Sequence, residues 1–325
     1  MTAAAQPKRL AGVDCARALC MLYIVGVHHM QSFVAPGTVI DRLANHAQPA
    51  LYTFTALSAL FLGRRAMDSA ADVRAFLRRR LVRAYPLYLL GCLTLFVVSL
   101  AVGKYFHGVR QLALTLAGLS MVFGPAPRTM WYMSMLLLFW ALTPLFNWRH
   151  RATGASAALR AGLLLALLAA FRGLQLLGTG LDSRLYGHAA VYFGALILAD
   201  FAKLEDRPNP AWLALVALGA LLARLPDFPR GLGQNLAGVA AILFAGQLCA
   251  LLPPLAAALG WVSYASMNAY LFHRQWLGLG FYLLGPFSLP LAAAMLAALL
   301  AGCWAVQRGY DAWVVPRIEG RGKRE

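Results

Sequence analysis

The sequence predicts an all-α membrane protein, a bundle of about ten transmembrane helices. Three observations predict this class. Hydrophobic residues make up 61% of the 325 positions and charged residues only 13%, whereas soluble domains are about half apolar and about a quarter charged. Apolar runs long enough to span a bilayer recur along the chain. Basic residues gather in the short segments between those runs, as topology signals do.

The apolar runs set the expected spans and the domain organisation. We expect spans at 12–34, 48–63, 84–103, 129–147, 159–178, 186–202, 210–225, 232–251, 263–284 and 287–308. The stretch 110–124 is apolar but short, and we expect it to be re-entrant or interfacial. Nothing marks a linker or repeat, so one transmembrane domain is expected over 1–325, with a cytoplasmic stub at 1–9 and a basic cytoplasmic tail at 309–325.

The formal net charge of +17 points to the membrane and not to nucleic acid. The arginines sit in loops on one side of the expected bundle, and this bias predicts that both termini are cytoplasmic. Some of the charge is expected to meet membrane lipid headgroups or a phosphorylated ligand. The five cysteines all fall in apolar runs without a CxxC pair, so neither a disulfide framework nor a metal site is predicted.

The first expected span carries four ionisable groups: Asp14, Arg17, His28 and His29. Such groups are costly in hydrocarbon and mark a functional site by default. Arg17 and His28 are eleven residues apart, about three α-helical turns, and share a face to within about 20°. His29 is turned away by about 100°. The spacing therefore nominates His28, although a packed histidine pair beside an Asp14–Arg17 ion pair stays open.

The segment before the third expected span is rich in arginine. Asp68 or Ser69 is expected to cap a short helix there, and Pro86 to occupy the first turn of the span. Arg80 and Arg83 are three residues apart and are expected to share a helix face. Two interpretations stay open: a basic anchor at the lipid headgroups, or a cytoplasmic clamp for phosphate groups, which Arg binds in bidentate fashion.

The ninth expected span contains a second set of polar residues. Tyr270 and His273 are one turn apart, and Arg274 adjoins them. They predict either hydrogen-bonded packing groups or a site. Elsewhere the sequence predicts an aromatic belt at 131–132 and groups at the edges of spans. Those edge groups are Arg172, His188 and Asp200.

Four motifs together resemble the acyltransferase-3 family of polytopic membrane acyltransferases. The first is Asp14-x-x-Arg17 followed by His28. The second is the aromatic and small-residue run from Tyr52 through Ser58, with Ala59 where the family usually has Gly. The third is the set Arg79, Arg80, Arg83, Pro86 and Tyr88. The fourth is Ser263-Tyr264 followed by Tyr270 and His273.

One position departs from part of that family. Members that acetylate O-antigens carry a Glu in a W-S-L-x-x-E pattern, whereas here the run is Trp131 to Leu136 without a carboxylate. The resemblance therefore implies no particular acceptor from that branch.

The resemblance implies transfer of an acyl group, most often acetyl, from acyl-CoA to a hydroxyl of a glycan or lipid-linked sugar. It implies His28 as general base, with Asp14 and Arg17 setting the local charge. Arg79, Arg80 and Arg83 would hold the CoA phosphates. His273 and Tyr270 would line the pocket or stabilise the oxyanion. No metal or permanently bound cofactor is expected, and the expected location is a bacterial inner membrane.

Two rival functions fit the same residues. A transporter or flippase for an anionic or lipid-linked substrate would also place His, Arg and Asp in a substrate path. A non-catalytic membrane scaffold would tolerate substitution of His28 and Arg83. The acceptor, and the choice of acetyl, succinyl or a longer acyl group, stay open.

Overall fold

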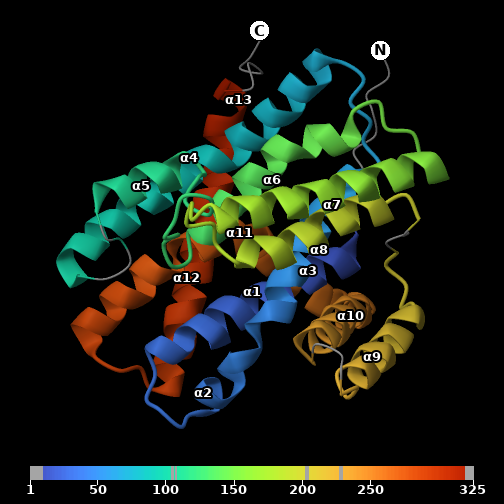
Figure 1. Ribbon diagram of the computed structural model, residues 1–325. Coiled ribbons are helices and arrows are strands. Elements are labelled where there is room, and N and C mark those ends of the chain that lie inside the picture. Colours follow the sequence, from blue (N-terminus) through green and yellow to red (C-terminus); the bar gives the residue numbers. More distant parts are fainter. Residues whose placement is uncertain (1–9, 104–105, 107, 202–204, 227–229, 319–325) are drawn as a thin grey trace, which may run out of the picture. The chain divides into compact units, whose positions relative to one another are not determined.

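The computed structural model describes residues 10–103, 106, 108–201, 205–226 and 230–318 (Figure 1). These ranges are all-helical and contain no strand, as the sequence predicts. The expected stub at 1–9 and the end of the expected tail, 319–325, lie outside them.

Five helical segments in the described ranges are long and apolar enough to cross a membrane, so the expected count of ten is not confirmed. The five are Ala11–Ser32, Ala70–Val102, Gly154–Leu176, Arg230–Ala250 and Leu289–Ile318. The span expected at 263–284 lies within the 32-residue helix Pro253–Leu284, whereas the remaining expected spans fall on helices that are short for a bilayer, which takes about 20 residues. Examples are α6 (Trp131–Asn147, 17 residues) and α9 (Ala211–Leu222, 12 residues).

The chain divides into two compact units, and each is described by itself. Unit 1 is built from Met1–Ser32, Pro36–Phe54 and Lys203–Ser266. Unit 2 is built from Phe33–Ala35, Thr55–Ala202 and Met267–Glu325. The division falls within α3 (Ala47–Gly63) and within α11 (Pro253–Leu284), so each of these helices contributes to both units.

In unit 1, α10 (Arg230–Ala250) packs against both α1 (Ala11–Tyr23) and α9, its neighbour in Figure 1. The α1–α10 contact depends on small residues. A Cβ atom at Gly246 would lie 2.5 Å from the Gly12 carbonyl oxygen and 2.8 Å from the Ala16 Cβ. Small residues let helix backbones approach closely, which is how helices associate where lipid removes the hydrophobic driving force. Unit 1 also contains the short helix α2 (Val39–Leu43) and the turn η3 (Ala44–His46).

In unit 2, the arginine-rich segment and the third expected span form one helix, α4 (Ala70–Val102, 33 residues). Ser69 caps it in a capping box with Asp72, so the expected cap is confirmed. The expected helix start at Pro86 is wrong, because Pro86 lies inside α4. A proline there removes the hydrogen bond to the carbonyl four residues earlier. That carbonyl belongs to Val82, and the Tyr310 hydroxyl donates to it instead.

The other helices of unit 2 are α5 (Val109–Leu116), α7 (Gly154–Leu176), α8 (Arg184–Leu198), α12 (Leu289–Gly309), η4 (Tyr310–Val314) and α13 (Val315–Ile318). Within unit 2, α6 contacts α4, α5 and α8. The α6–α8 contact is aromatic: the Phe146 and Phe193 rings stack at 4.2 Å, and Phe139 lies 5.0 Å from Tyr192. The stretch 110–124 forms most of α5 and a turn. Since α5 has only 8 residues, it is too short to span a bilayer.

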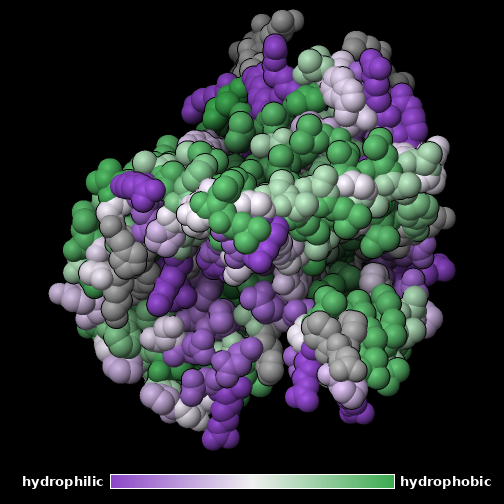
Figure 2. Space-filling model, viewed as in Figure 1, coloured by the Kyte–Doolittle hydropathy of each residue, from purple (hydrophilic) through white to green (hydrophobic). Residues whose placement is uncertain are grey.

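Apolar side chains cover the outside of α7. Leu159, Leu165 and Leu176 are each about two-thirds exposed or more. Figure 2 shows this apolar surface in green along α7. A helix that turns leucines outward over its length is typical of a segment facing lipid, and not of one facing water.

Candidate functional site

The first element of the candidate site is a change of helix type at the two histidines. α1 ends at Tyr23 and continues as the π-helix η1 (Ile24–His29), followed by the 3-10 turn η2 (Met30–Ser32). A π turn closes i→i+5 hydrogen bonds, so it holds more residues than an α turn and shifts the phase of the residues after it. Short π segments within α-helices occur frequently at functional sites. The face shared by Arg17 and His28 was predicted for a continuous α-helix and does not carry over this turn.

His28 has a defined tautomer. Its Nδ1 lies 2.8 Å from the carbonyl oxygen of Ala44, in η3. A carbonyl can only accept, so Nδ1 carries the proton, and in the neutral ring the lone pair is on Nε2. His28 is half-buried, whereas the neighbouring His29 is buried, with its ring centroid 4.9 Å away. The structure thus distinguishes the two histidines, with His28 the more accessible.

Asp14, also in unit 1, contacts the fourth motif. Its Oδ1 accepts a hydrogen bond of 3.1 Å from the hydroxyl of Ser263 on α11. Their contact was not predictable from the sequence, because 249 positions separate the two residues. Asp14 and Arg17 are both half-buried on α1.

In unit 2, Thr129 connects Tyr270 and Arg274. The Tyr270 hydroxyl donates to the Thr129 carbonyl at 2.7 Å, and Arg274 Nε donates to the Thr129 hydroxyl at 3.2 Å. Thr129 has φ of 75°, which is rare for a β-branched residue and persists only where the surroundings hold it. His273 Nδ1 lies 2.8 Å from the Tyr270 carbonyl, and the His273 side chain is fully buried.

A buried polar cluster beside Tyr270 was not predicted as a site. The Thr55 hydroxyl lies 2.9 Å from His188 Nδ1 and 3.3 Å from the Tyr132 hydroxyl. The Tyr132 ring lies edge-on to the Tyr270 ring, with centroids 5.5 Å apart. Tyr132 is therefore part of the core and not of an aromatic belt. His188, expected at a span edge, is 1% exposed.

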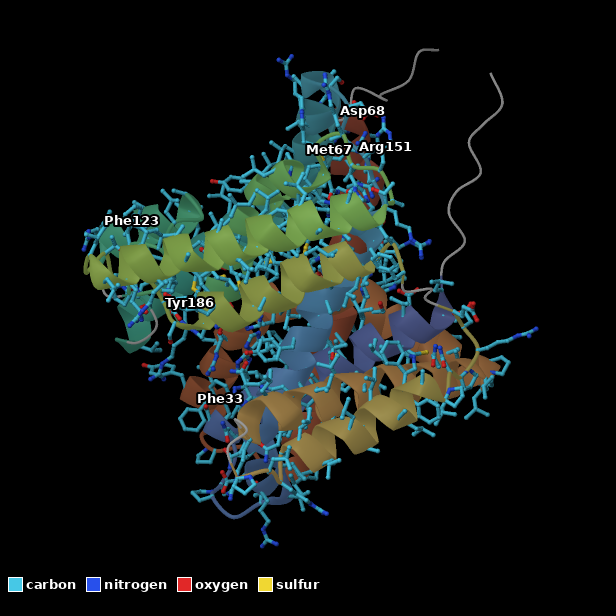
Figure 3. All side chains as sticks on the ribbon, turned by 45° about the vertical axis from the view of Figure 1, so that its right-hand side comes forward. Phe33, Met67, Asp68, Phe123, Arg151 and Tyr186 are labelled. Atoms are coloured by element: carbon cyan, nitrogen blue, oxygen red, sulfur yellow. The ribbon has the colours of Figure 1, made fainter. Side chains whose placement is uncertain are left out.

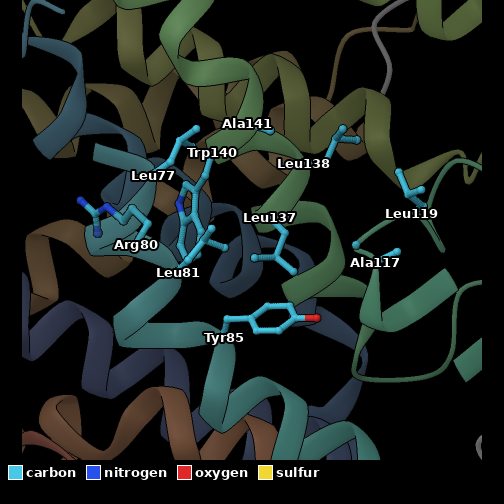
Figure 4. Close-up of a pocket in the computed structure, with 11 residues that line it drawn as sticks. Leu77, Arg80, Leu81, Tyr85, Ala117, Leu119, Leu137, Leu138, Trp140 and Ala141 are labelled. Atoms are coloured by element: carbon cyan, nitrogen blue, oxygen red, sulfur yellow. The ribbon is translucent and has the colours of Figure 1, made fainter. Parts of the chain in front are cut away.

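The three arginines expected to hold phosphate differ in their surroundings on α4. Arg79 and Arg83, four residues apart and therefore on one face, are exposed. Arg80 is half-buried, and its guanidinium carbon lies 5.9 Å from the ring centroids of both Phe76 and Trp140. Arg80 lines a pocket of about 270 Å³ formed by α4, α6 and the turn after α5 (Figure 4). The expected Arg80–Arg83 pair is thus divided between a pocket wall and an exposed face.

A buried ionic group lies near the start of α7 and the end of α8. Arg160 Nη1 lies 2.9 Å from Asp200 Oδ2, and His150 Nε2 lies 3.0 Å from the same oxygen. Arg160 also donates to the Leu196 and Gly63 carbonyls. Asp200 was expected at the edge of a span, but it and Arg160 are both buried.

The predicted site residues fall into both units. Unit 1 holds Asp14, Arg17 and His28; unit 2 holds Tyr270, His273, Arg79, Arg80 and Arg83. Within the described ranges, no three His, Cys, Asp or Glu side chains gather in a way that could hold a metal ion. Long apolar helices that carry ionisable groups define an integral membrane protein.

Comparison with protein families identifies which membrane protein class this is. A family model described as an acyltransferase domain matches residues 10–308, nearly the whole chain. The chain therefore belongs to the acyltransferase-3 family, and the resemblance predicted from the four motifs is confirmed. Searches among curated proteins and among solved structures found no match.

Proposed function

We propose that the protein transfers an acyl group, most often acetyl, from acyl-CoA to a hydroxyl of a glycan or lipid-linked sugar. The family supports acyl transfer within a membrane. The observation that carries the finer proposal is the hydrogen bond between His28 Nδ1 and the Ala44 carbonyl. It orients the ring and leaves Nε2 as the proton acceptor, which is what a general base needs.

The reaction follows from that tautomer. His28 Nε2 takes the proton of the acceptor hydroxyl as its oxygen forms a bond to the thioester carbon. The carbon–sulfur bond then breaks, and the thiolate of CoA takes the proton back from Nε2. In the intermediate imidazolium both ring nitrogens are donors, so the bond to Ala44 persists and stabilises the charged ring.

Tyr270 and His273 fit a positioning role better than an oxyanion hole. The Tyr270 hydroxyl proton is engaged by the Thr129 carbonyl. The proton on His273 Nδ1 is engaged by the Tyr270 carbonyl, so a neutral His273 offers an acceptor at Nε2 and no donor. An oxyanion needs donors. We therefore assign these two residues to positioning their neighbours within unit 2 and not to binding the oxyanion.

The donor phosphates would bind at Arg79 and Arg83, the exposed pair on one face of α4. Arg80, expected with them from sequence, lies instead beside Trp140. Asp14 and Arg17 would set the charge along α1. The arginine bias between spans supports cytoplasmic termini in a bacterial inner membrane, which gives acyl-CoA access from the cytoplasm.

The test replaces His28 with Asn. The Asn amide can donate to the Ala44 carbonyl as Nδ1 does, but it cannot accept the hydroxyl proton at the position of Nε2. We expect H28N to remain folded and to lose about 10²- to 10⁴-fold in turnover, the usual contribution of a general base. The readout is release of CoA thiol by the purified protein in the presence of a glycan acceptor fraction. The matched control is H29N.

Undiminished turnover in H28N would remove the base assignment. Absence of acceptor-dependent thiol release from the wild-type protein, together with movement of a lipid-linked sugar across vesicles, would favour the transporter.

A further inference from the structure

The pocket beside Arg80 has a polar end, and its remainder is apolar except for Tyr85, whose hydroxyl donates to the Leu116 carbonyl. Of the groups around it, Arg80 supplies the charge and Trp140 an indole N–H, whereas Leu77, Leu81 and Leu137 are purely aliphatic (Figure 4). The indole nitrogen lies on the side of the Trp140 ring that faces Arg80 (Figure 4). The charge and the N–H donor therefore lie at the same end.

The Trp140 N–H is a buried donor that needs an acceptor. Trp140 is 8% exposed, and its Nε1 has no hydrogen-bond partner among the described residues. Buried N–H groups are nearly always hydrogen-bonded, so one without a protein partner indicates a bound group. Beside a guanidinium, the favoured acceptor is an anion, because Arg and an adjacent N–H bind charged oxygens together.

The pocket lies where the exposed residues of α4 change from basic to apolar. On its N-terminal side the helix carries the exposed Arg78, Arg79 and Arg83. Beyond them the exposed residues are apolar and include Leu90, Val97 and Leu100. Such a change, from basic to apolar surface on one spanning helix, is expected at the level of the lipid headgroups. Basic pockets between membrane helices bind anionic headgroups.

The size and lining select one kind of occupant. At about 30 Å³ for each water-sized group, 270 Å³ accommodates about nine methylene-sized groups, the first part of one acyl chain. The pantetheine arm of CoA carries amides, and aliphatic walls would leave them without hydrogen bonds. We propose that this pocket binds an anionic phospholipid, with its phosphate at Arg80 and the Trp140 N–H and one acyl chain among the leucines. The proposal is independent of the acyl-transfer reaction.

The test measures lipid binding to the full-length protein by native mass spectrometry. Protein freed of lipid in an uncharged detergent is titrated with phosphatidylglycerol or phosphatidylcholine of identical chains. We expect tighter binding of phosphatidylglycerol. R80Q should weaken it about fivefold, the effect of one basic residue near an anionic surface, and W140F should weaken it as well, with little change for phosphatidylcholine in either variant. R74Q, an exposed arginine on the same helix, is the charge-matched control and should bind as the wild type does.

A second pair of variants tests the apolar part. Ala141 is an exposed residue of the pocket wall, so A141W closes the pocket without entering the core. We expect A141W to abolish the phosphatidylglycerol preference, and A166W, at an exposed alanine on α7, to retain it. Equal binding of the two lipids, wild-type binding by R80Q, or retention of the preference by A141W would overturn the proposal. So would displacement of the lipid by palmitoyl-CoA, which would assign the pocket to the donor.

Discussion

Arg160 and Asp200 form an ion pair inside unit 2, with Nη1 and Oδ2 2.9 Å apart and both side chains about 97% buried. Each charge depends on the other, because taking two charges out of water is costly unless they are paired. His150 and the Leu196 carbonyl complete the hydrogen bonding around the pair. This group joins the start of α7 to the end of α8 and to the turn between α6 and α7.

Removal of one partner should destabilise unit 2 strongly. R160M leaves the Asp200 carboxylate buried without its cation, which costs about 3–5 kcal/mol. The double variant R160M/D200L removes both charges and should recover most of that loss. Thermal unfolding in detergent measures both. Equal destabilisation by the single and the double variant would show that the two charges are not coupled.

The control is an exposed ion pair in the same unit. Arg151 Nη1 lies 3.0 Å from Asp68 Oδ1, and the two side chains are 64% and 54% exposed (Figure 3). R151A should change stability by about 0–1 kcal/mol, since solvent screens such pairs.

The α1–α10 contact in unit 1 should not tolerate a methyl group at Gly246. The added Cβ would lie 2.5 Å from the Gly12 carbonyl oxygen, so the helices must separate. Overpacking of this kind costs about 1–3 kcal/mol. G162A on α7 is the control: nothing lies within 4 Å of its Cβ, and Ala should gain about 0.5–1 kcal/mol over Gly within a helix. Unfolding midpoints that move in the same direction for both variants would contradict this packing.

Loss of the Tyr270 hydroxyl should affect stability more than turnover. Y270F leaves the Thr129 carbonyl with only the 3.4 Å bond from the Tyr132 N–H, and loss of the Tyr270 hydrogen bond costs about 0.5–1.5 kcal/mol. Since that proton is already engaged, we expect kcat/KM of the folded protein to fall less than tenfold. Y186F, which loses a half-buried bond to Gln175, controls for the hydroxyl itself. A loss of about 10²-fold or more, as for an oxyanion-hole donor, would instead assign Tyr270 to the chemistry.

Local features of the fold were predictable from the sequence. The capping box at Ser69 and Asp72 is read from four consecutive residues, because both bonds close within one turn. The apolar runs located the helices. The number of long spans was not predictable in the same way, since α6, α8 and α9 are shorter than the spans expected at their positions.

The contacts within the site were predictable only where they are local. Tyr270 and His273 were expected to be neighbours from helix spacing, and they are. The Thr55–His188 bond joins positions 133 residues apart, and no period in a single sequence shows which helices pack together. No residue type marks the π turn at His28. Arg80 shares a face with Arg83 by spacing alone, but Trp140 of α6 decides where its guanidinium lies.

Asp182, in the turn before α8, should make unit 2 sensitive to acid. Burial acts to raise the pKa of this carboxyl, but the hydrogen bonds and charge of Arg184 outweigh it and hold the pKa below its ordinary value. A carboxyl whose pKa is lower folded than unfolded stabilises the fold above the unfolded pKa, about 3.9. That contribution is lost as pH falls through the folded pKa. The stability difference between the wild type and D182N should therefore shrink on acidification from about pH 6 to about pH 3. R184Q removes the cause of the low pKa and should abolish the same pH dependence. A wild-type–D182N difference that stays constant over this range, or that grows toward acid, would show that Arg184 does not stabilise the Asp182 carboxylate.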